Sequence, residues 1–402
     1  MFKFGFSGDD INDVEVDDTD SGESTVEEIA GPNAAATVIA GDTELYDIVD
    51  LLHSLPSRIS YSLLDVHNTS PSSERDASSQ KCTELRIPRR EVFDIKVQIM
   101  ADEDLLPSIS GDDEKTTAPK DEEEAKNHFR KKELQILLSN TEDLKTHLYE
   151  GGLKSWEGAG DLVEYLADYQ IALGKGVLEL GCGSALPSIY LFQNYVLQIL
   201  SSSSEEVRAP VSFIMSDYNY AVLRLMTAPN FLLAYYNVLQ SLNFDSEEQT
   251  QIADLDLQIT PELLDQFFSF LEKHNISIKF ISGPWNTEKF AGLLGYASSI
   301  STARIRFSSV LGSETIYSVA STNAFIPILL DSVALWNTFP DSNRESPLGL
   351  VAAKEIYFGV GGTVRQFIED AEKKGGNLEI VRRIASGQSS GVARVIIKTT
   401  LK

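Results

Sequence analysis

The sequence predicts an α/β fold, a doubly wound and mostly parallel sheet that finishes with an antiparallel hairpin. Three observations support this prediction. From about residue 176, apolar β-type runs alternate with stretches of helical periodicity, which implies right-handed crossovers between parallel strands. The first run, GVLEL, leads into a turn with two glycines, Gly181 and Gly183. The last two runs flank GQSSG and predict the hairpin.

Each element follows from its local pattern. Five apolar runs predict the strands that precede the hairpin: GVLEL, VSFIMSD, ISIKFISG, RFSSVL and LGLVAAKEIYF. PSIYLFQNYVLQIL predicts a helix entered through Pro187, because proline suits a first helical turn. Two further helical regions contain Pro229 and Pro327, and TVRQFIEDAEKKGG predicts a helix that ends at glycines. LEIVRRIAS and VARVIIKTTL are the strands of the hairpin.

Composition divides the chain into three parts. Residues 1–85 are predicted to be a largely disordered acidic region, because 7–30 contain no Lys or Arg and too few apolar residues to offset the entropy of ordering. Within it, the stretch from Thr43 predicts one short helix followed by an extended piece. Residues 86–126 are predicted to be a docking segment and an acidic loop, and 127–402 the main domain.

Bulk properties exclude several classes of protein. No apolar run of the 402-residue chain approaches the roughly 20 residues of a membrane span. Two cysteines and five histidines without metal-ligand spacing predict neither a disulfide framework nor a metal site, and favour a reducing cytoplasmic or nuclear compartment. A net charge of −26 disfavours nucleic acid and anionic lipid as partners. The acidity indicates either a basic protein partner or no more than solubility.

The glycine turn predicts a site at the tip of the first strand, in the crevice that such sheets use for ligands. A dinucleotide fingerprint would require a third glycine where this chain has Leu186. Glu179 would repel a pyrophosphate and favour an ammonium or sulfonium group instead. The alternative is an ordinary tight turn.

Two further strand tips carry residues of the same kind. Asp217 ends the second strand and is placed to accept ribose hydroxyls, although it could be a helix N-cap. It lies 36 residues after Gly181, and SSSSEEVRAP accounts for the long spacing as a surface insertion. Trp285 follows the third strand, where an adenine ring would lie, and Trp156 precedes the first helix of the main domain. Either tryptophan could be a core residue.

Six motifs occur in a specific order: GLKSWE, LELGCGSALPS, DYN, SGPW, GSETIY and AAKEIYFGVGG. Together they resemble the seven-β-strand methyltransferases that act on proteins, and within these the fungal and animal histidine methyltransferases that modify a large-subunit ribosomal protein. The resemblance runs from about Arg89 to the C-terminus. It implies a Rossmann-like class I methyltransferase fold, S-adenosylmethionine as cofactor and a basic ribosomal protein as substrate. We expect a monomer.

The resemblance also implies a set of site residues. Those expected to hold the cofactor are Ser155, Trp156, Glu157, Gly158, Ala159, Glu179, Gly181, Gly183, Asp217, Tyr218, Asn219, Gly283, Pro284, Trp285 and Ser313. Those expected to act in catalysis are Glu314, Tyr317 and Asn219. The chain departs from related sequences in two places: Gly158 replaces a larger or thiol side chain, and Ala185 stands where glycine is frequent.

Histidine is a suitable acceptor because imidazole is largely neutral at cellular pH, whereas lysine must first lose a proton. We hypothesise that one ring nitrogen attacks while Glu314 holds the N–H of the other. Glu314 could instead be a capping carboxylate at a helix start. Two alternatives stay open: lysine methylation on the same fold, and a cofactor-binding chaperone of a ribosomal protein without turnover.

Overall fold

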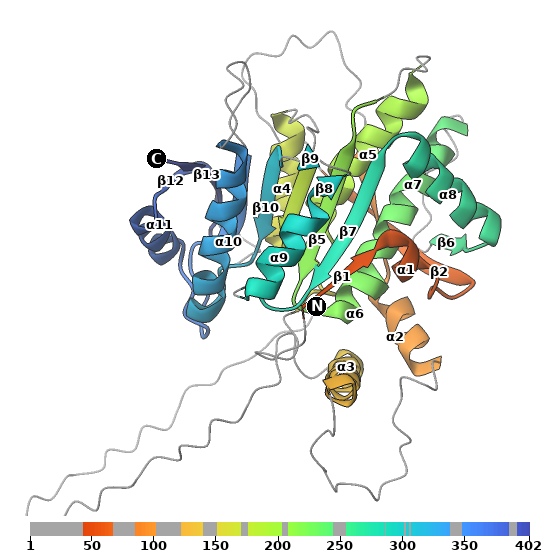
Figure 1. The fold of residues 1–402 in the computed structure, drawn as a ribbon, viewed down its shortest axis with the longest axis horizontal. Helices are drawn as coiled ribbons and strands as arrows, with labels where there is room; N and C mark the ends of the chain where they lie inside the picture. The colour runs from red at the N-terminus through yellow and green to blue at the C-terminus, as the bar shows by residue number, and fades with distance from the viewer. Residues whose placement is uncertain are drawn as a thin grey trace, which may run out of the picture. The chain divides into compact units, whose positions relative to one another are not determined.

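The computed structural model describes residues 43–66, 85–101, 122–139, 151–169, 176–202, 208–243, 255–285, 287–300, 303–304, 307–337, 348–385 and 392–402. Within these ranges the centre is an eight-stranded sheet in the order β1-β7-β5-β4-β10-β11-β13-β12 (Figure 1). Its strands are β1 (Glu44–Asp47), β4 (Gly176–Leu180), β5 (Val211–Asp217), β7 (Ile276–Ser282), β10 (Ser309–Ser313), β11 (Leu348–Lys354), β12 (Gly376–Ile384) and β13 (Arg394–Leu401).

The strand directions confirm the predicted fold. Neighbours among β7, β5, β4, β10 and β11 are parallel, and β13 is antiparallel to both β11 and β12. Strands β4 and β5 are buried along their whole length, which explains why they read as continuous apolar runs rather than alternating ones. The fourth parallel strand begins at Ser309, later than the RFSSVL run suggested.

The eighth strand, β1, was not predicted. It pairs antiparallel with β7 and leads into α1 (Ile48–Leu52), which Asp47 caps through a reciprocal capping box. A second sheet, in the order β3-β2-β6, joins β2 (Arg58–Val66), β3 (Leu85–Arg90) and β6 (Leu255–Gln258). The folded part therefore includes 43–66, inside the segment assigned to the acidic region. Residues 1–42 lie outside the described ranges.

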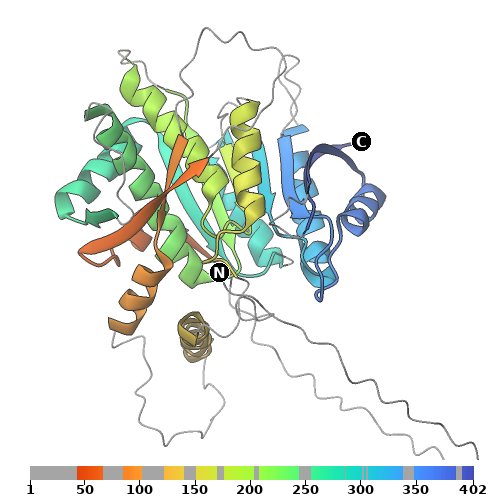
Figure 2. The same ribbon diagram turned by 180° about the vertical axis from the view of Figure 1, so that it is seen from behind.

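Helices cover both faces of the central sheet (Figures 1 and 2). The helices are α2 (Val92–Ala101), α3 (Glu122–Ser139), α4 (Glu157–Asp168), α5 (Leu186–Ser201), α6 (Tyr220–Val222), the π-helical η1 (Leu223–Thr227), α7 (Ala228–Asn243), α8 (Pro261–Lys273), α9 (Glu288–Ala297), α10 (Val319–Asn337) and α11 (Val364–Lys373). A small hairpin joins β8 (Ser299–Ile300) to β9 (Ala303–Arg304). None of the helices described is long and apolar enough to cross a bilayer.

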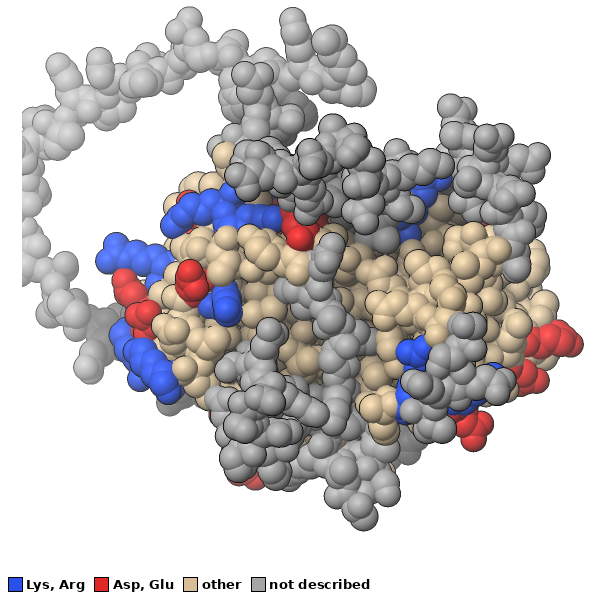
Figure 3. Space-filling model, turned by 90° about the horizontal axis from the view of Figure 1, so that it is seen from above, with Lys and Arg blue, Asp and Glu red and all other residues tan. Residues whose placement is uncertain are grey.

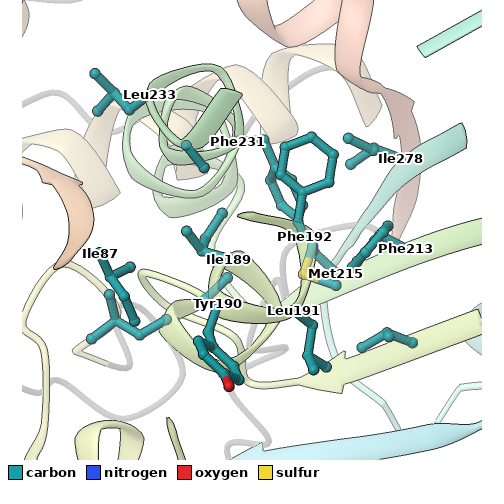
Figure 4. Packing of buried hydrophobic residues seen from close by; sticks show 14 of the residues in the cluster. Ile87, Ile189, Tyr190, Leu191, Phe192, Phe213, Met215, Phe231, Leu233 and Ile278 are labelled. Atoms are coloured by element: carbon teal, nitrogen blue, oxygen red, sulfur yellow. The ribbon is translucent and has the colours of Figure 1, made fainter. Parts of the chain in front are cut away.

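The larger core cluster fills the space between the sheet and the layer of α4, α5 and α7 (Figure 4). Phe192 lies at its centre, with ring centroids 5.6 Å from Phe213 and 5.1 Å from Phe231, both edge to face. Fully buried aromatic rings in this geometry contribute strongly to stability. They pack α5 and α7 against β5, whose tip carries part of the predicted site.

The sequence predicts that Pro229 interrupts a helix, and the backbone before this proline is where the buried Arg90 binds. In a regular α-helix the N–H of residue 229 would bond the carbonyl of Leu225, but proline has no N–H. The chain forms the π-helical turn η1 immediately before it, and the fully buried Arg90 donates from Nη1 to the Leu225 carbonyl at 2.9 Å. The same guanidinium donates to Asp94 at 2.7 Å and to Gln98 at 2.7 Å.

We expect Arg90→Ala to lower the free energy of unfolding by about 3–5 kcal/mol, because Asp94 loses its cation and the Leu225 carbonyl loses its donor. Arg365→Ala is a matched control, since Arg365 also pairs with a carboxylate four residues on but is 88% exposed. Its loss should leave the free energy of unfolding nearly unchanged, because solvent screens an exposed ion pair. Urea unfolding of both variants would measure this, and equal small effects would contradict a structural role for Arg90.

Candidate functional site

The predicted glycine turn lies at the carboxyl end of β4, and other parts of the protein pack closely against it. Gly181 and Gly183 both have positive φ, +64° and +51°. A Cβ on Gly183 would lie 3.0 Å from the carbonyl oxygen of Gly152, and one on Gly181 would lie 2.8 Å from Thr315 Cγ2. Side chains are therefore excluded at both positions by conformation and by space.

Polar side chains from three other segments hold this turn. Asp217, at the tip of β5, is 5% exposed and accepts hydrogen bonds from the N–H of Gly183 at 2.9 Å and of Asn219 at 3.1 Å. Thr227 in η1 donates to the carbonyl of Gly183 at 2.6 Å. Asn230 in α7 donates to the carbonyl of Ser184 at 2.9 Å. Sequence reasoning found Asp217 and missed Thr227 and Asn230, which no local pattern marks.

Glu179 lies beneath the turn rather than on its surface. Its carboxylate is fully buried, and one oxygen accepts hydrogen bonds from the N–H and the hydroxyl of Ser188 in the first turn of α5. The other oxygen, Oε1, is buried without a hydrogen-bond partner among the described residues. Burial raises the pKa of Glu179 to about 7. It fixes the start of α5 and leaves one unsatisfied acceptor.

The turn after β7 brings Trp285 to the glycines. Gly283 has φ +99° and donates its N–H toward the carbonyls of Asp217 and Tyr218. The Trp285 Nε1 donates to the Ser216 hydroxyl at 3.0 Å, and its ring packs on Phe325. Trp285 is half-buried, as is Pro284 before it. The indole therefore has a fixed orientation beside Gly181.

A second group of predicted residues gathers around Glu314, just after β10. This residue is 9% exposed and has φ +56°, which is rare for a residue other than glycine and costs about 1–3 kcal/mol. Its carboxylate accepts hydrogen bonds from the Gly158 N–H at 3.2 Å and from the Tyr357 hydroxyl. Burial raises the pKa of the Glu314 carboxyl, and the Tyr357 hydroxyl opposes this effect. Glu314 thus caps the start of α4 from another part of the chain.

The departure at Gly158 now has a physical reason. A Cβ at this position would lie 2.8 Å from Oε1 of Glu314 and 3.2 Å from its Cδ. The larger side chain of related sequences would displace the carboxylate as it is placed here. Ala185, the other departure, has the left-handed φ of 55° that explains why glycine is frequent there.

The remaining predicted residues surround these two groups. Ser155 lies between Arg89, which donates to it at 3.0 Å, and the hydroxyl of Ser184 at 3.1 Å. Trp156 is the N-cap residue of α4. Lys154 and Lys354 lie over its ring, with Nζ 4.9 Å and 5.2 Å from the centroid. Glu157 is exposed and pairs with Lys354 at 3.3 Å, and Ala159 is buried.

Three predicted residues have less direct roles in this geometry. Ser313 and Tyr317 are half-buried on either side of Glu314, and the carbonyl of Tyr317 accepts a hydrogen bond from the Gly362 N–H. Asn219 is fully buried, and its side chain bonds to Glu133. Its predicted catalytic role would require this amide to reach the substrate. In this structure it supports the tip of β5.

Sequence reasoning missed Tyr357 and Glu133. Tyr357 belongs to the AAKEIYFGVGG motif, and its hydroxyl lies beside Glu314. The motif could therefore have marked it as a site residue. Glu133 is 1% exposed on the largely polar helix α3 and accepts a hydrogen bond from the Ala221 N–H at 3.2 Å. Phe129, four residues earlier, packs edge to face on Tyr218, with centroids 6.4 Å apart. Helix α3 thus covers the tip of β5, where it lines a pocket of ≈ 390 Å³ with α6 and η1.

Glu133 gives a pH prediction. Burial raises its pKa to about 8 from 4.5, so between these values the folded protein keeps a proton that the unfolded chain loses. The free energy of unfolding then falls with rising pH by about 1.4 kcal/mol per unit for this group. Glu133→Gln cannot titrate, so its stability relative to the wild type should rise from about pH 5 to about pH 8. Urea unfolding across that range measures the difference, with the exposed Glu288→Gln as control. A difference independent of pH would contradict the prediction.

No protein-family profile matches the chain. Among curated proteins, it is 33% identical over 289 residues to histidine protein methyltransferase 1 of Saccharomyces cerevisiae, covering 69% of this chain and 67% of that protein. The protein of the same name from Schizosaccharomyces pombe is 32% identical over 287 residues, covering 71% and 68%. A homologue in Dictyostelium discoideum is 29% identical over 274 residues, covering 67% and 64%.

Solved structures with similar topology include the glycopeptide N-methyltransferase MtfA complexed with sinefungin, with TM-score 0.32 and 10% identity over 61% of this chain and 94% of that one. Another is the methyltransferase domain of bacterial CtHen1-C, with TM-score 0.29 and 15% identity over 60% and 96%. The family of this chain is assigned from its sequence relatives, in agreement with the observed strand order. The chain belongs to the histidine protein methyltransferase 1 family.

Proposed function

We propose that the protein transfers a methyl group from S-adenosylmethionine to a ring nitrogen of a histidine in a basic protein of the large ribosomal subunit. Family membership supports a methyltransferase with this donor. The observation that carries the choice of site is the buried carboxylate of Glu314. It is held by two hydrogen-bond donors and is adjacent in the chain to Thr315, whose side chain lies against Gly181. A carboxylate fixed beside the cofactor turn is suited to hold an imidazole N–H.

The residues at the strand tips fit the cofactor. The unsatisfied Oε1 of Glu179 would be compensated by a nearby cationic group such as an ammonium or sulfonium. The Asp217 carboxylate can accept about four hydrogen bonds, so its two backbone donors are compatible with ribose hydroxyls. Trp285 offers a half-buried ring for the adenine. Among the described residues no cluster of His, Cys, Asp or Glu is placed to hold a metal ion.

When bound, the cofactor supplies an activated methyl group, so the protein must mainly orient the acceptor and exclude water. One neutral ring nitrogen of the substrate histidine forms the new N–C bond while the S–C bond breaks and its electron pair stays on sulfur. The Glu314 carboxylate holds the N–H of the other ring nitrogen and accepts its proton as the ring becomes cationic. Tyr357 and the Gly158 N–H keep the carboxylate in place.

Charge supports a basic protein as substrate. The chain carries −26, and 7–30 contain acidic residues without Lys or Arg. On the face in Figure 3, in contrast, Lys and Arg lie beside Asp and Glu, and the described residues show no extended patch of one sign. An acidic segment increases the encounter rate with a basic protein and disfavours nucleic acid. We propose that the protein acts as a monomer in the cytoplasm and nucleus.

The direct test is to incubate the protein with labelled S-adenosylmethionine and large-subunit ribosomal proteins from cells that lack the enzyme. Mass spectrometry of the labelled protein then identifies the modified residue. Methylation of a histidine ring nitrogen is expected. Methyl-lysine would support the alternative acceptor, and cofactor binding without any transfer would support the non-catalytic chaperone.

Glu314→Gln keeps the size of the side chain but removes its capacity to accept a proton. We expect kcat to fall about 100-fold or more, with the Kd for the cofactor product changed by less than about threefold. Tyr357→Phe removes the hydroxyl that lowers the pKa of Glu314. It should shift the acidic limb of the pH–rate profile to higher pH. A large loss of cofactor affinity in Glu314→Gln would instead indicate a role in cofactor binding.

Gly158→Ala places a methyl group against the Glu314 carboxylate and should lower kcat about 10- to 100-fold by displacing it. Gly160→Ala is the matched control on the same helix, because a Cβ there meets nothing within 4 Å. It should leave kcat unchanged and raise stability by up to about 1 kcal/mol through better helix propensity. Steady-state kinetics of the two variants distinguish them; equal activities would show that contact with Gly158 does not position Glu314.

A further inference from the structure

Four exposed apolar side chains lie together beside the Glu314 site. Ile356, Phe358 and Val360 follow β11 and are 47%, 76% and 45% exposed, and Val319 at the start of α10 is 58% exposed. An isolated backbone bridge between Ser318 and Gly361 brings the two segments side by side. We name these four residues the apolar patch. Single exposed apolar residues are common on protein surfaces, whereas several together at a site indicate a binding surface.

The backbone beneath the apolar patch is fixed by hydrogen bonds. Tyr357 donates to the carbonyl of Gly362 at 2.9 Å, and Gly361 donates to the carbonyl of Tyr357 at 3.2 Å. Gly362 donates to the carbonyl of Tyr317 at 3.0 Å, and a Cβ on Gly362 would lie 2.1 Å from the carbonyl oxygen of Ile316. The exposed side chains are therefore presented by an ordered loop, which reduces the entropy lost on binding.

Tyr357 makes the apolar patch continuous with the site. Its hydroxyl donates to Glu314, while its neighbours in the chain, Ile356 and Phe358, are exposed. A polypeptide that presents a histidine to Glu314 must place the residues next to that histidine on the surrounding surface. An extended chain rises about 3.3 Å per residue, so the patch is reached within a few residues.

The charges around the apolar patch are matched. Glu355 pairs with Arg383, and Lys354 pairs with Glu157 at 3.3 Å. An apolar centre with a polar rim is typical of protein–protein interfaces, and an aromatic anchor such as Phe358 is a frequent hot spot. A nucleic acid would require an excess of Lys and Arg, which these pairs do not provide.

From these observations we infer that Val319, Ile356, Phe358 and Val360 dock the substrate polypeptide, receiving an aliphatic or aromatic side chain within a few residues of the target histidine. This inference rests on the proposed function. Phe358 is the anchor, because it is the largest and most exposed side chain of the four. The patch contributes to substrate binding and leaves cofactor binding to the strand tips.

The test is Phe358→Ser, assayed with labelled S-adenosylmethionine and large-subunit ribosomal proteins from cells lacking the enzyme. KM for the ribosomal protein that serves as substrate should rise about 10- to 30-fold. The kcat, the Kd for the cofactor and the midpoint of thermal unfolding should stay nearly unchanged. Tyr296→Ser, on α9, removes an aromatic ring that is 68% exposed and is the matched control, for which KM should not change. Val360→Ser should show a smaller rise than Phe358→Ser.

A wild-type KM in Phe358→Ser would overturn the docking role while leaving the proposed function intact. Light scattering that shows a wild-type dimer dissociated by Phe358→Ser, without a change in KM, would assign the patch to a second copy of the chain instead. Failure of the wild-type protein to methylate any histidine would remove the proposed function and the docking role with it.

Discussion

The hydrogen bond from the Gly183 N–H to the Asp217 carboxylate is the constraint on which the site depends, because it joins the tips of β4 and β5. The turn it holds has positive φ at Gly181, Gly183 and Ala185, a conformation that would not persist without support from outside. Thr227 and Asn230 supply that support through backbone carbonyls. The glycine turn is therefore built jointly by the sheet and by the helical segment that follows β5.

That helical segment in turn depends on a residue far away in sequence. Pro229 removes one backbone donor, and the π-helical turn before it leads to Thr227, whose hydroxyl reaches Gly183. Arg90 satisfies the carbonyl that proline leaves open. The π-helical turn and the fully buried Arg90 thus meet at the backbone that precedes Pro229. Loss of Arg90 is expected to act on the turn through η1, without any contact between Arg90 and the glycines.

The sequence was sufficient for the sheet and its tips, because buried parallel strands are continuous apolar runs and their ends carry glycines or acids. Gly181, Gly183, Asp217 and Trp285 do meet in space. Strand β1 was not predictable, since its four residues, two of them acidic, show no strand pattern of their own. Glu133 was not predictable either, because its burial results from the packing of a polar helix on the tip of β5. Such contacts join segments that are distant in sequence, and no local pattern in a single sequence predicts them.

At Glu314 the structure shows the capping contact that the sequence offered as an alternative, and this contact is compatible with the proposed catalytic role. It caps the start of α4, and it is adjacent in the chain to Thr315, which lies against Gly181 in the glycine turn. Capping fixes the carboxylate without neutralising it, since Gly158 and Tyr357 each donate one hydrogen bond and neither carries a positive charge. A carboxylate held this way keeps acceptor capacity for an imidazole N–H. The strained backbone of Glu314 is then understandable as a requirement of the site, because the helix start and the Tyr357 hydroxyl together determine where the carboxylate must lie.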